Sequence, residues 1–197
     1  MNYGKSKQLM ELAVNKMGSS KKLETVLIRS PWFYGPNQPE RQTTFFKMIQ
    51  SGKFPILGNG NNRRSMAYLD NIIQGLFLAS DKDEAVGETF WISDKKPYTM
   101  NEIVDTVKNI LRDEYHFKVA EKNLHLPYII GSFATIFDAL LQKLGLYNQK
   151  IHVLSELNKT IACSIEKAEK LLNYQPKIDL YEGMKRSIKW CIDKGYL

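Results

Sequence analysis

A short apolar run at residues 24–29, E-T-V-L-I-R, is the feature that most limits the folds open to this chain. Its β-branched and aliphatic residues are nearly continuous, which is typical of a strand buried on both faces of a parallel sheet. The segment S-P-W-F-Y-G-P follows at residues 30–36, and its prolines and glycine predict a turn at the strand's carboxyl end. Open α/β sheets bind ligands at the carboxyl ends of their strands, so we expect an α/β fold with a site beside this turn.

Helical patterns dominate the rest of the chain. Apolar residues recur at helical spacing in residues 3–17, and a capping box, T-M-N-E, predicts the start of another helix at Thr99. Asp70 is placed to cap a helix that begins at residue 71. Residues 126–144 predict a long apolar helix. Its most apolar stretch, residues 126–137, is about a dozen residues, shorter than the ~20 that a membrane-spanning helix needs. We therefore expect no membrane span.

The charge and the metal-binding residue types exclude several classes of function. The net charge of the 197 residues is +7, but the lysines and arginines are scattered, so the pattern does not favour a nucleic-acid partner. Cys163 and Cys191 and the three histidines show no metal-ligand spacing, and we expect no metal site. The N-terminus lacks the pattern of a secretory signal, which favours a cytoplasmic protein with reduced thiols.

Tyr3 and Lys7 are the first candidates for chemistry. Residues four apart on a helix lie on one face, so the ammonium of Lys7 can lie close to the phenol of Tyr3. A neighbouring cation favours the phenolate and makes the tyrosine a plausible proton acceptor and donor. The alternative is a chance pair, since this spacing is common in helices.

Four segments together resemble a known family. The Y-G-K-S-K of residues 3–7 resembles the Y-x-x-S-K active-site motif of the extended short-chain dehydrogenase/reductases, the NAD-dependent epimerase/dehydratase family. Residues 28–36 resemble the strand and Y-G-P turn of that family, and residues 64–71 resemble its R-x-x-x-x-V-D-D segment. Residues 162–190 are similar to its ending, K-A … L-G-Y-x-P … E-G … W. The segments occur in the family's order and span nearly the whole chain.

The resemblance implies the C-terminal part of a Rossmann-type doubly wound sheet, from the Y-x-x-x-K motif onward. Residues 1–97 would be the remaining half of the NAD(P)-binding domain, and residues 98–197 a mostly helical substrate-binding region interleaved with it. The N-terminal Gly-rich βαβ units, which hold the cofactor pyrophosphate, are expected to be absent, because the Y-x-x-x-K motif opens the chain. The G-N-G at residues 58–60 lacks their fingerprint and is expected to be a plain turn. A separate N-terminal Rossmann half is therefore a possible partner, and this part alone is expected to be inactive.

The resemblance also implies roles for individual residues. Tyr3 would be the acid/base, and Lys7 would lower the pKa of Tyr3 and hold the nicotinamide ribose of NAD or NADP. Both residues would contact the cofactor, together with Ser30, Pro31 and Trp32 of the turn. The complete enzyme would be a homodimer.

Substrate contacts are implied for Trp32 and Arg64, where Arg64 would reach the phosphate of a nucleotide sugar. Its alternative is a surface arginine on a turn. The chain has no arginine between His125 and Ser164, and Asn71 departs from the V-D-D pattern, which favours relatives that act on sterols or flavonols. The apolar helix at residues 126–144 would suit such a substrate pocket, or it would be ordinary core.

The sequence thus predicts an NAD(P)-dependent epimerase, dehydratase or oxidoreductase acting on a hydroxyl or keto group of a small-molecule substrate. Two alternatives stay open. One is an inactive C-terminal fragment that serves only in substrate binding or dimerisation, and the other is a nucleic-acid-binding protein whose affinity would fall steeply with salt.

Overall fold

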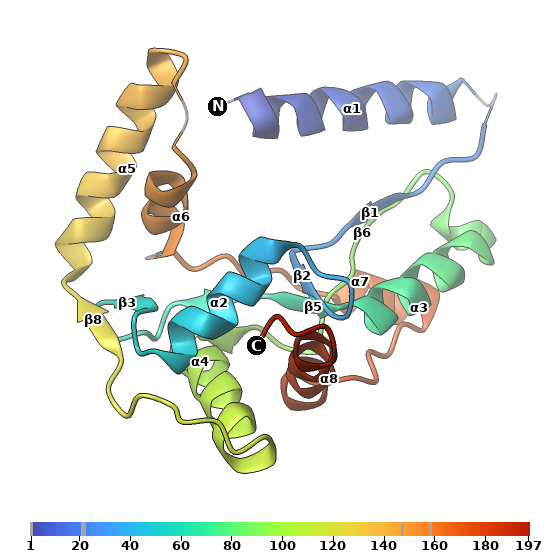
Figure 1. Ribbon diagram of the computed structural model, residues 1–197. Helices are drawn as coiled ribbons and strands as arrows, with labels where there is room; N and C mark the ends of the chain where they lie inside the picture. Colours follow the sequence, from blue (N-terminus) through green and yellow to red (C-terminus); the bar gives the residue numbers. More distant parts are fainter. Residues whose placement is uncertain (1, 21–22, 147, 158) are drawn as a thin grey trace.

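The computed structural model describes residues 2–20, 23–146, 148–157 and 159–197 (Figure 1). Its first half contains α1 (Asn2–Ser19), β1 (Leu27–Arg29), β2 (Trp32–Tyr34), α2 (Glu40–Gln50), β3 (Pro55–Leu57), β4 (Arg63–Arg64), β5 (Met66–Tyr68), α3 (Leu69–Ser80), the 3-10 turn η1 (Asp83–Ala85) and β6 (Thr89–Trp91). Its second half contains β7 (Tyr98–Thr99), α4 (Met100–Asn109), the π-helical turn η2 (Ile110–Glu114), β8 (Leu124–Leu126), α5 (Tyr128–Lys143), α6 (Gln149–Leu157), α7 (Glu166–Leu172) and α8 (Leu180–Asp193).

The strands form short pairs, and most of these are parallel. β1 pairs with β6, β2 with β5, and β3 with β8, all in parallel, whereas β4 and β7 are antiparallel. Each parallel pair joins strands far apart in sequence, with helices in the connections. The predicted α/β class is confirmed, and the run at residues 24–29 supplies β1.

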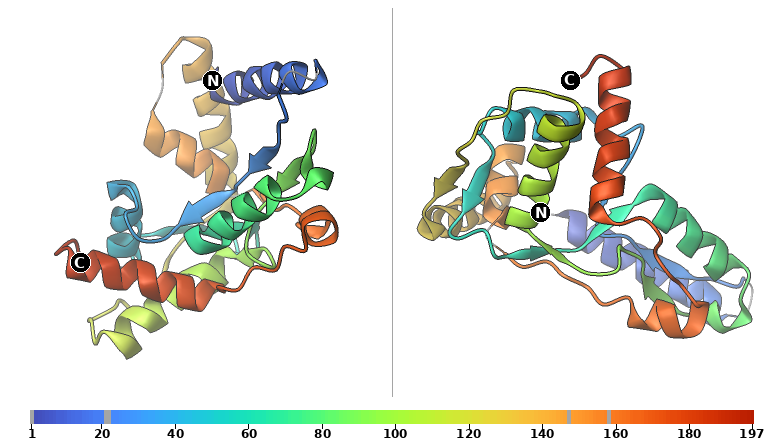
Figure 2. Two further views of the ribbon diagram at one scale, coloured as in Figure 1. Left: turned by 90° about the vertical axis from the view of Figure 1, so that its right-hand side faces the viewer. Right: turned by 90° about the horizontal axis from the view of Figure 1, so that it is seen from below.

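Two apolar cores hold the described elements together. The larger core lies among α2, α4, α8 and the strands β2, β3 and β5, and Figure 2 shows α4 and α8 side by side. The smaller core lies where α3 and α7 cover one face of β6, around Phe90, Ile92 and Tyr174. Because Ile28 of β1 packs against the smaller core, the strand is fixed on that face.

α1 and α5 lie at the periphery of the fold (Figure 1). α1 approaches the segment that precedes β1 at Gly18, where an added Cβ would lie 2.3 Å from Oγ1 of Thr25. α5 packs along α6, and its other side is exposed to solvent. No helix in the described ranges is long and apolar enough to cross a membrane.

The helix starts test two local predictions. Thr99 caps α4 as predicted. Its Oγ1 accepts from the backbone N–H of Glu102 at 3.0 Å, and Oε2 of Glu102 accepts from the backbone N–H of Thr99 at 2.6 Å. The predicted cap at Asp70 is wrong. α3 begins one residue earlier, at Leu69, so Asp70 lies inside its first turn, where its carboxylate pairs with Nη1 of Arg186 at 3.2 Å.

Candidate active site

One row of α1 is turned toward the end of β1. Glu11 Oε1 accepts from Nε of Arg29 at 2.8 Å, and Oε2 accepts from Nη2 at 2.5 Å. The guanidinium holds the pKa of Glu11 below its usual range through these hydrogen bonds. Positions 3, 7 and 11 follow one another at a spacing of four, so Lys7 belongs to the same row as Glu11. The side chain of Tyr3 lies outside the part of the chain that the structure describes.

The turn after β1 carries an unsatisfied polar atom. Oγ of Ser30 is buried and has no hydrogen-bond partner among the described residues. A buried hydroxyl without a partner costs free energy, which a bound polar group would recover. An amide such as the carboxamide of a nicotinamide can both donate to and accept from a hydroxyl, so the chemistry at Ser30 fits that end of the cofactor.

Trp32 follows Ser30 and Pro31 at the start of β2. Its indole ring meets the ring of Phe45 edge-on, with 5.3 Å between centroids, and is partly buried against the larger core. The ring is therefore held by α2. Of the predicted cofactor-binding residues in this turn, Ser30 has a buried hydroxyl without a hydrogen-bond partner among the described residues, and Trp32 has packing contacts.

Arg64 lies elsewhere, on β4. Its side chain is buried, and Nη2 donates to the backbone carbonyl of Glu156 in the last turn of α6. Burial lowers the pKa of the guanidinium. Nε of Arg64 is buried without a hydrogen-bond partner among the described residues. The alternative of a surface arginine on a turn is wrong, because the side chain is buried and donates to a carbonyl at the end of α6.

Asp94 anchors a buried polar network that the sequence analysis missed. Its Oδ2 accepts from the Tyr34 hydroxyl at 2.8 Å, and its Oδ1 accepts from the backbone N–H of Tyr68 at 3.0 Å and from Nδ2 of Asn71 at 2.8 Å. Burial raises the pKa of Asp94 to about 6. Burial and the nearby carboxylate raise the pKa of Tyr34, which stays a neutral donor. The available signal was Ser93-Asp94, a polar pair that follows β6 after one further apolar residue, Ile92.

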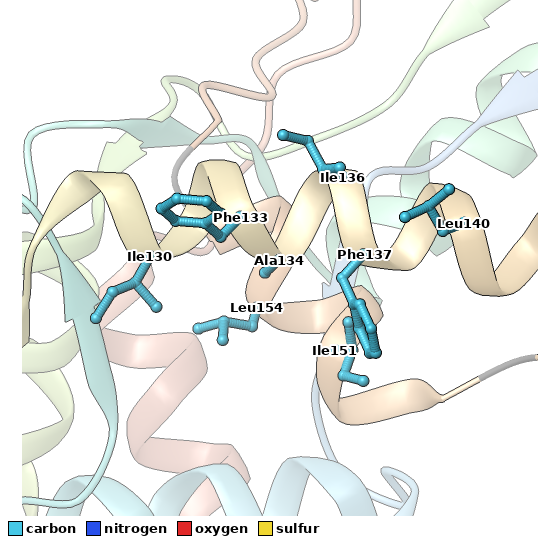
Figure 3. Close-up of a pocket in the computed structure, with 8 residues that line it drawn as sticks. All are labelled: Ile130, Phe133, Ala134, Ile136, Phe137, Leu140, Ile151 and Leu154. Atoms are coloured by element: carbon cyan, nitrogen blue, oxygen red, sulfur yellow. The ribbon is translucent and has the colours of Figure 1, made fainter.

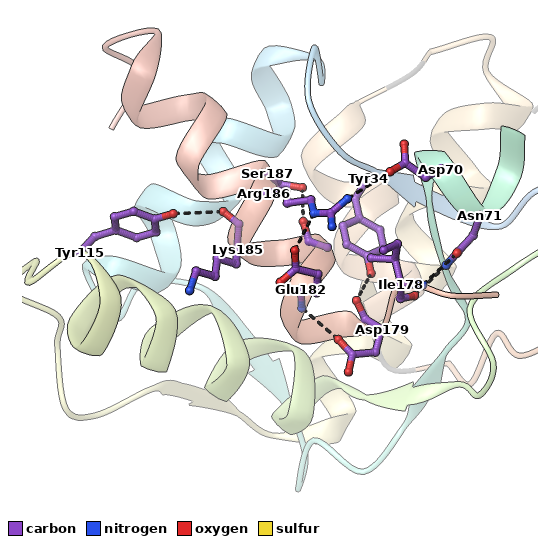
Figure 4. Close-up of polar contacts among 11 residues, drawn as sticks. Tyr34, Asp70, Asn71, Tyr115, Ile178, Asp179, Glu182, Lys185, Arg186 and Ser187 are labelled. Carbon is purple, nitrogen blue, oxygen red and sulfur yellow. Dashed lines mark hydrogen bonds and ion pairs between the residues drawn. The ribbon is translucent and has the colours of Figure 1, made fainter.

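Asn71 connects this network to the C-terminal segment. Its Oδ1 accepts from the backbone N–H groups of Lys177 and Ile178, at 3.0 and 3.1 Å. Its Nδ2 also donates to the carbonyl of Ile178 at 2.7 Å, and Figure 4 shows Asn71 facing Ile178. An aspartate here could not donate and would place a second carboxylate beside Asp94. The departure from V-D-D at this position therefore has a local physical cause.

An apolar groove of about 440 Å³ lies between α5 and α6 (Figure 3). It is lined by Ile130, Phe133, Ala134, Ile136, Phe137, Leu140, Ile151 and Leu154. None of these side chains can form a hydrogen bond, so the lining favours an apolar occupant. Within the described ranges, no group of three or more His, Cys, Asp or Glu side chains could hold a metal ion.

The comparisons with known proteins agree with one another. Residues 1–118 match the 3-beta hydroxysteroid dehydrogenase/isomerase family. The chain is 55% identical over 194 residues to "Uncharacterized protein y4nL" of Sinorhizobium fredii, and the alignment covers 98% of this chain and 54% of that protein. It is 27% identical over 203 residues to a decarboxylating sterol-4-alpha-carboxylate 3-dehydrogenase of Candida albicans, with 95% of this chain and 55% of that protein covered.

A solved structure with a similar fold is that of the UDP-glucuronic acid 4-epimerase from Bacillus cereus in complex with NAD. The TM-score is 0.71 at 20% identity, and the match covers 100% of this chain and 54% of that one. The chain thus spans about half the length of the curated relatives that it matches, and it corresponds to their C-terminal part.

Proposed function

We propose that this chain, which belongs to the 3-beta hydroxysteroid dehydrogenase/isomerase family, supplies the acid/base residues of an enzyme that exchanges hydride with NAD or NADP. The reaction class is oxidation, reduction or epimerisation at a hydroxyl or keto carbon of a small-molecule substrate. In that enzyme Tyr3 moves the proton and Lys7 holds the phenolate and the nicotinamide ribose.

The Glu11–Arg29 pair is the observation that carries this proposal. It turns the row of α1 that contains Lys7 toward the carboxyl end of β1, where Ser30 has its unsatisfied hydroxyl. Carboxyl ends of parallel strands are where α/β sheets bind cofactors. The candidate proton-transfer residues and the candidate nicotinamide contacts therefore belong to two neighbouring elements.

Each residue has a defined task in the proposed reaction. When bound, the nicotinamide accepts or donates the hydride. Tyr3, as a phenolate, takes the proton of the substrate hydroxyl during oxidation and returns it during reduction, and the ammonium of Lys7 favours the phenolate that is present before the proton is taken and after it is returned. Ser30 hydrogen-bonds the carboxamide, and Pro31 and Trp32 shape the wall beside it.

The proposed substrate has a large apolar part. Relatives of this chain include sterol-4-alpha-carboxylate 3-dehydrogenases and, at 29% identity, an Escherichia coli epimerase named for an undecaprenol-linked sugar. Arg64 is the proposed contact for a phosphate or carboxylate of the substrate, because its buried Nε can still donate. Trp32 would contact the same substrate through the edge of its ring.

The test uses a chimera in which this chain replaces the matched 54% of the S. fredii protein. Turnover of a 3β-hydroxysterol, a polyprenyl-diphosphate sugar and a UDP-hexose is followed by the absorbance of reduced nicotinamide, or by product analysis for epimerisation. Tyr3→Phe should lower turnover of the accepted substrate by ~10²-fold or more, in the range for positioned acid/base groups. A Tyr3→Phe chimera with near-normal turnover would rule out the role of Tyr3.

A second candidate is an inactive module for substrate binding or dimerisation. The exposed apolar side chains of α1, Leu9, Leu12 and Met17, favour it because a second helix could cover them. This candidate predicts a folded chimera that binds substrate or dimerises without oxidising, reducing or epimerising any of the three compounds.

A further inference from the structure

Two glutamines near the start of α2 carry buried side-chain carbonyl oxygens. Gln38 lies just before the helix and is 9% exposed, and Gln42 lies in its first turn and is 4% exposed. Oε1 of each residue has no hydrogen-bond partner within the described ranges. A buried amide oxygen normally has a partner, and leaving it without one costs free energy. Two such oxygens so close in sequence point to one shared group that donates to both.

The amide nitrogens of the two glutamines are already used. Nε2 of Gln42 donates to the backbone carbonyl of Phe33 at 2.7 Å, and Nε2 of Gln38 donates to Sγ of Cys191 at 3.2 Å. The contact with Phe33 fixes how the Gln42 amide is turned, because its oxygen in that place would face another acceptor. Neither nitrogen is therefore left to donate to the other glutamine, and the two oxygens need a donor from a third group.

Both glutamines line one small cavity between β2, α2, β5 and α8. Its volume is about 10 Å³, close to the space that one water molecule occupies. The other six lining side chains are aromatic rings or methionines, and the hydroxyl of Tyr34 among them already donates to Asp94 at 2.8 Å. The two amide oxygens are therefore the main hydrogen-bonding atoms that the lining residues can offer to an occupant.

The uncharged lining selects between the two smallest donors, water and ammonium. No side chain that lines the cavity carries a formal charge. A buried cation without a carboxylate beside it costs far more free energy than a buried water molecule with two hydrogen bonds. The chemistry of the lining therefore favours water.

We propose that this cavity is the site of one ordered water molecule, which donates one hydrogen bond to Oε1 of Gln38 and the other to Oε1 of Gln42. The water then joins the segment before α2 to the first turn of the helix. Gln42 extends the connection to β2 through its bond to the carbonyl of Phe33. Phe33 follows Trp32, whose ring also lines the cavity, so the water lies beside the residue that the turn after β1 presents.

The first experiment measures urea unfolding of Gln38→Met, Gln42→Met and the double variant. Methionine has nearly the length of glutamine but is only a weak acceptor. Each single change releases the water and leaves the other carbonyl without a partner, whereas the second change removes that carbonyl as well. The loss in the folding equilibrium constant of the double variant should therefore be at least ~5-fold smaller than the product of the two single losses.

Gln74→Met in α3 is the matched control. Gln74 also has a buried Oε1 without a partner in the part of the chain that the structure describes, but it does not line the cavity. When Gln74→Met is combined with Gln42→Met, the two effects on the folding equilibrium constant should multiply to within ~2-fold, because the two sites share no water.

Nuclear magnetic resonance on the unaltered chain detects the water directly. We expect a nuclear Overhauser effect between the side-chain amide protons of Gln42 and a water molecule that stays bound longer than the protein takes to tumble. The effect should disappear in Gln38→Met. The amide of Gln8, exposed on α1, should show no such long-lived contact.

Each of three results would overturn the proposal. One is a double variant of Gln38 and Gln42 whose loss equals the product of the single losses to within ~2-fold, as for independent sites. Another is a folded, unaltered chain without a long-lived water contact at Gln42, a result that needs no variant to fold. The third is stabilisation by ammonium chloride over sodium chloride that the double variant abolishes, which would assign the cavity to a cation. None of these measurements needs turnover, so their outcome is independent of the proposed function.

Discussion

Arg29, the last residue of β1, holds Glu11 of α1 through two hydrogen bonds, with Nε 2.8 Å from Oε1 and Nη2 2.5 Å from Oε2. The same guanidinium lies over the ring of Trp91 on the neighbouring strand, 5.5 Å from its centroid. The side chain of Arg29 therefore connects α1, which carries the candidate acid/base residues, to the strand pair β1–β6. The other face of this pair packs against the smaller core. Lys7 lies one helical turn before Glu11 on the same row of α1.

Glu11→Gln should loosen α1 without unfolding the cores. Amide hydrogens of α1 are expected to exchange faster, while those of α4 keep their rates, because α4 is packed between α2 and α8. Glu84→Gln, an exposed carboxylate in η1, is the control and should change neither set. Since Arg29 lowers the pKa of Glu11, the attachment is present above its ordinary value of 4.5 and lost as the pH falls below it. Equal exchange rates in α1 for both variants would show that the pair does not hold the helix.

Asp94 predicts an opposite dependence on pH. Its pKa in the folded chain is raised from 3.8 to about 6, so between these values the folded state keeps a proton that the unfolded state has lost. The free energy of unfolding attributable to Asp94 therefore falls as the pH rises from about 4 to about 6, by up to about 3 kcal/mol, and is constant above that window. Subtracting the denaturant melts of Asp94→Asn from those of the unaltered chain isolates this slope. A difference that does not vary with pH would contradict the shift.

Gly183→Ala tests the close packing of Gly183 in α8 against Tyr34 and Tyr68. A Cβ at Gly183 would lie 2.8 Å from the Tyr34 hydroxyl and from Cδ2 of Tyr68, both in the larger core. We expect a loss of about 1–3 kcal/mol in the free energy of unfolding, as for an overpacked core. Gly4→Ala, whose Cβ meets nothing within 4 Å, is the control and should not destabilise the chain. Equal melting temperatures for the two variants would argue against this close approach.

Arg64→Gln should destabilise the chain by about 1–3 kcal/mol, because the carbonyl at the end of α6 loses a charged donor in a buried place. The neighbouring Arg63 is exposed, and Arg63→Gln removes the same charge from the surface. Urea denaturation of both variants compares the two sites. If they are equally stable, the contact between Arg64 and α6 contributes nothing measurable.

Much of the fold could be predicted because its signals are local. The run at residues 24–29 identified β1, the capping box at Thr99 fixed the start of α4, and the order of the motifs indicated the NAD-dependent epimerase/dehydratase class that the relatives bear out. Asp70 was misassigned as a cap because α3 begins one residue earlier, and its actual partner, Arg186, is 116 residues away. A sequence pattern cannot show such a partner.

The candidate site divides in the same way. Tyr3, Lys7 and the turn after β1 carry motif signals, and their roles stay predictions. The network around Asp94 has no motif, because Tyr34, Asn71 and Asp94 come together only when β2, β5 and β6 are assembled. Arg64 carried a motif signal for substrate binding, but its contact with α6 depends on a segment 92 residues away.

The most direct test of the account is a calorimetric titration of NAD, and then of NADP, into the S. fredii chimera and its Lys7→Met variant, with a thermal melt of each. The account predicts that the chimera binds one of the two cofactors and that Lys7→Met weakens binding by ~10-fold or more, as expected for the loss of a charged hydrogen bond worth about 1.5–3 kcal/mol. A folded Lys7→Met chimera that binds the cofactor as tightly as the unaltered one would contradict the placement of the nicotinamide between α1 and the end of β1.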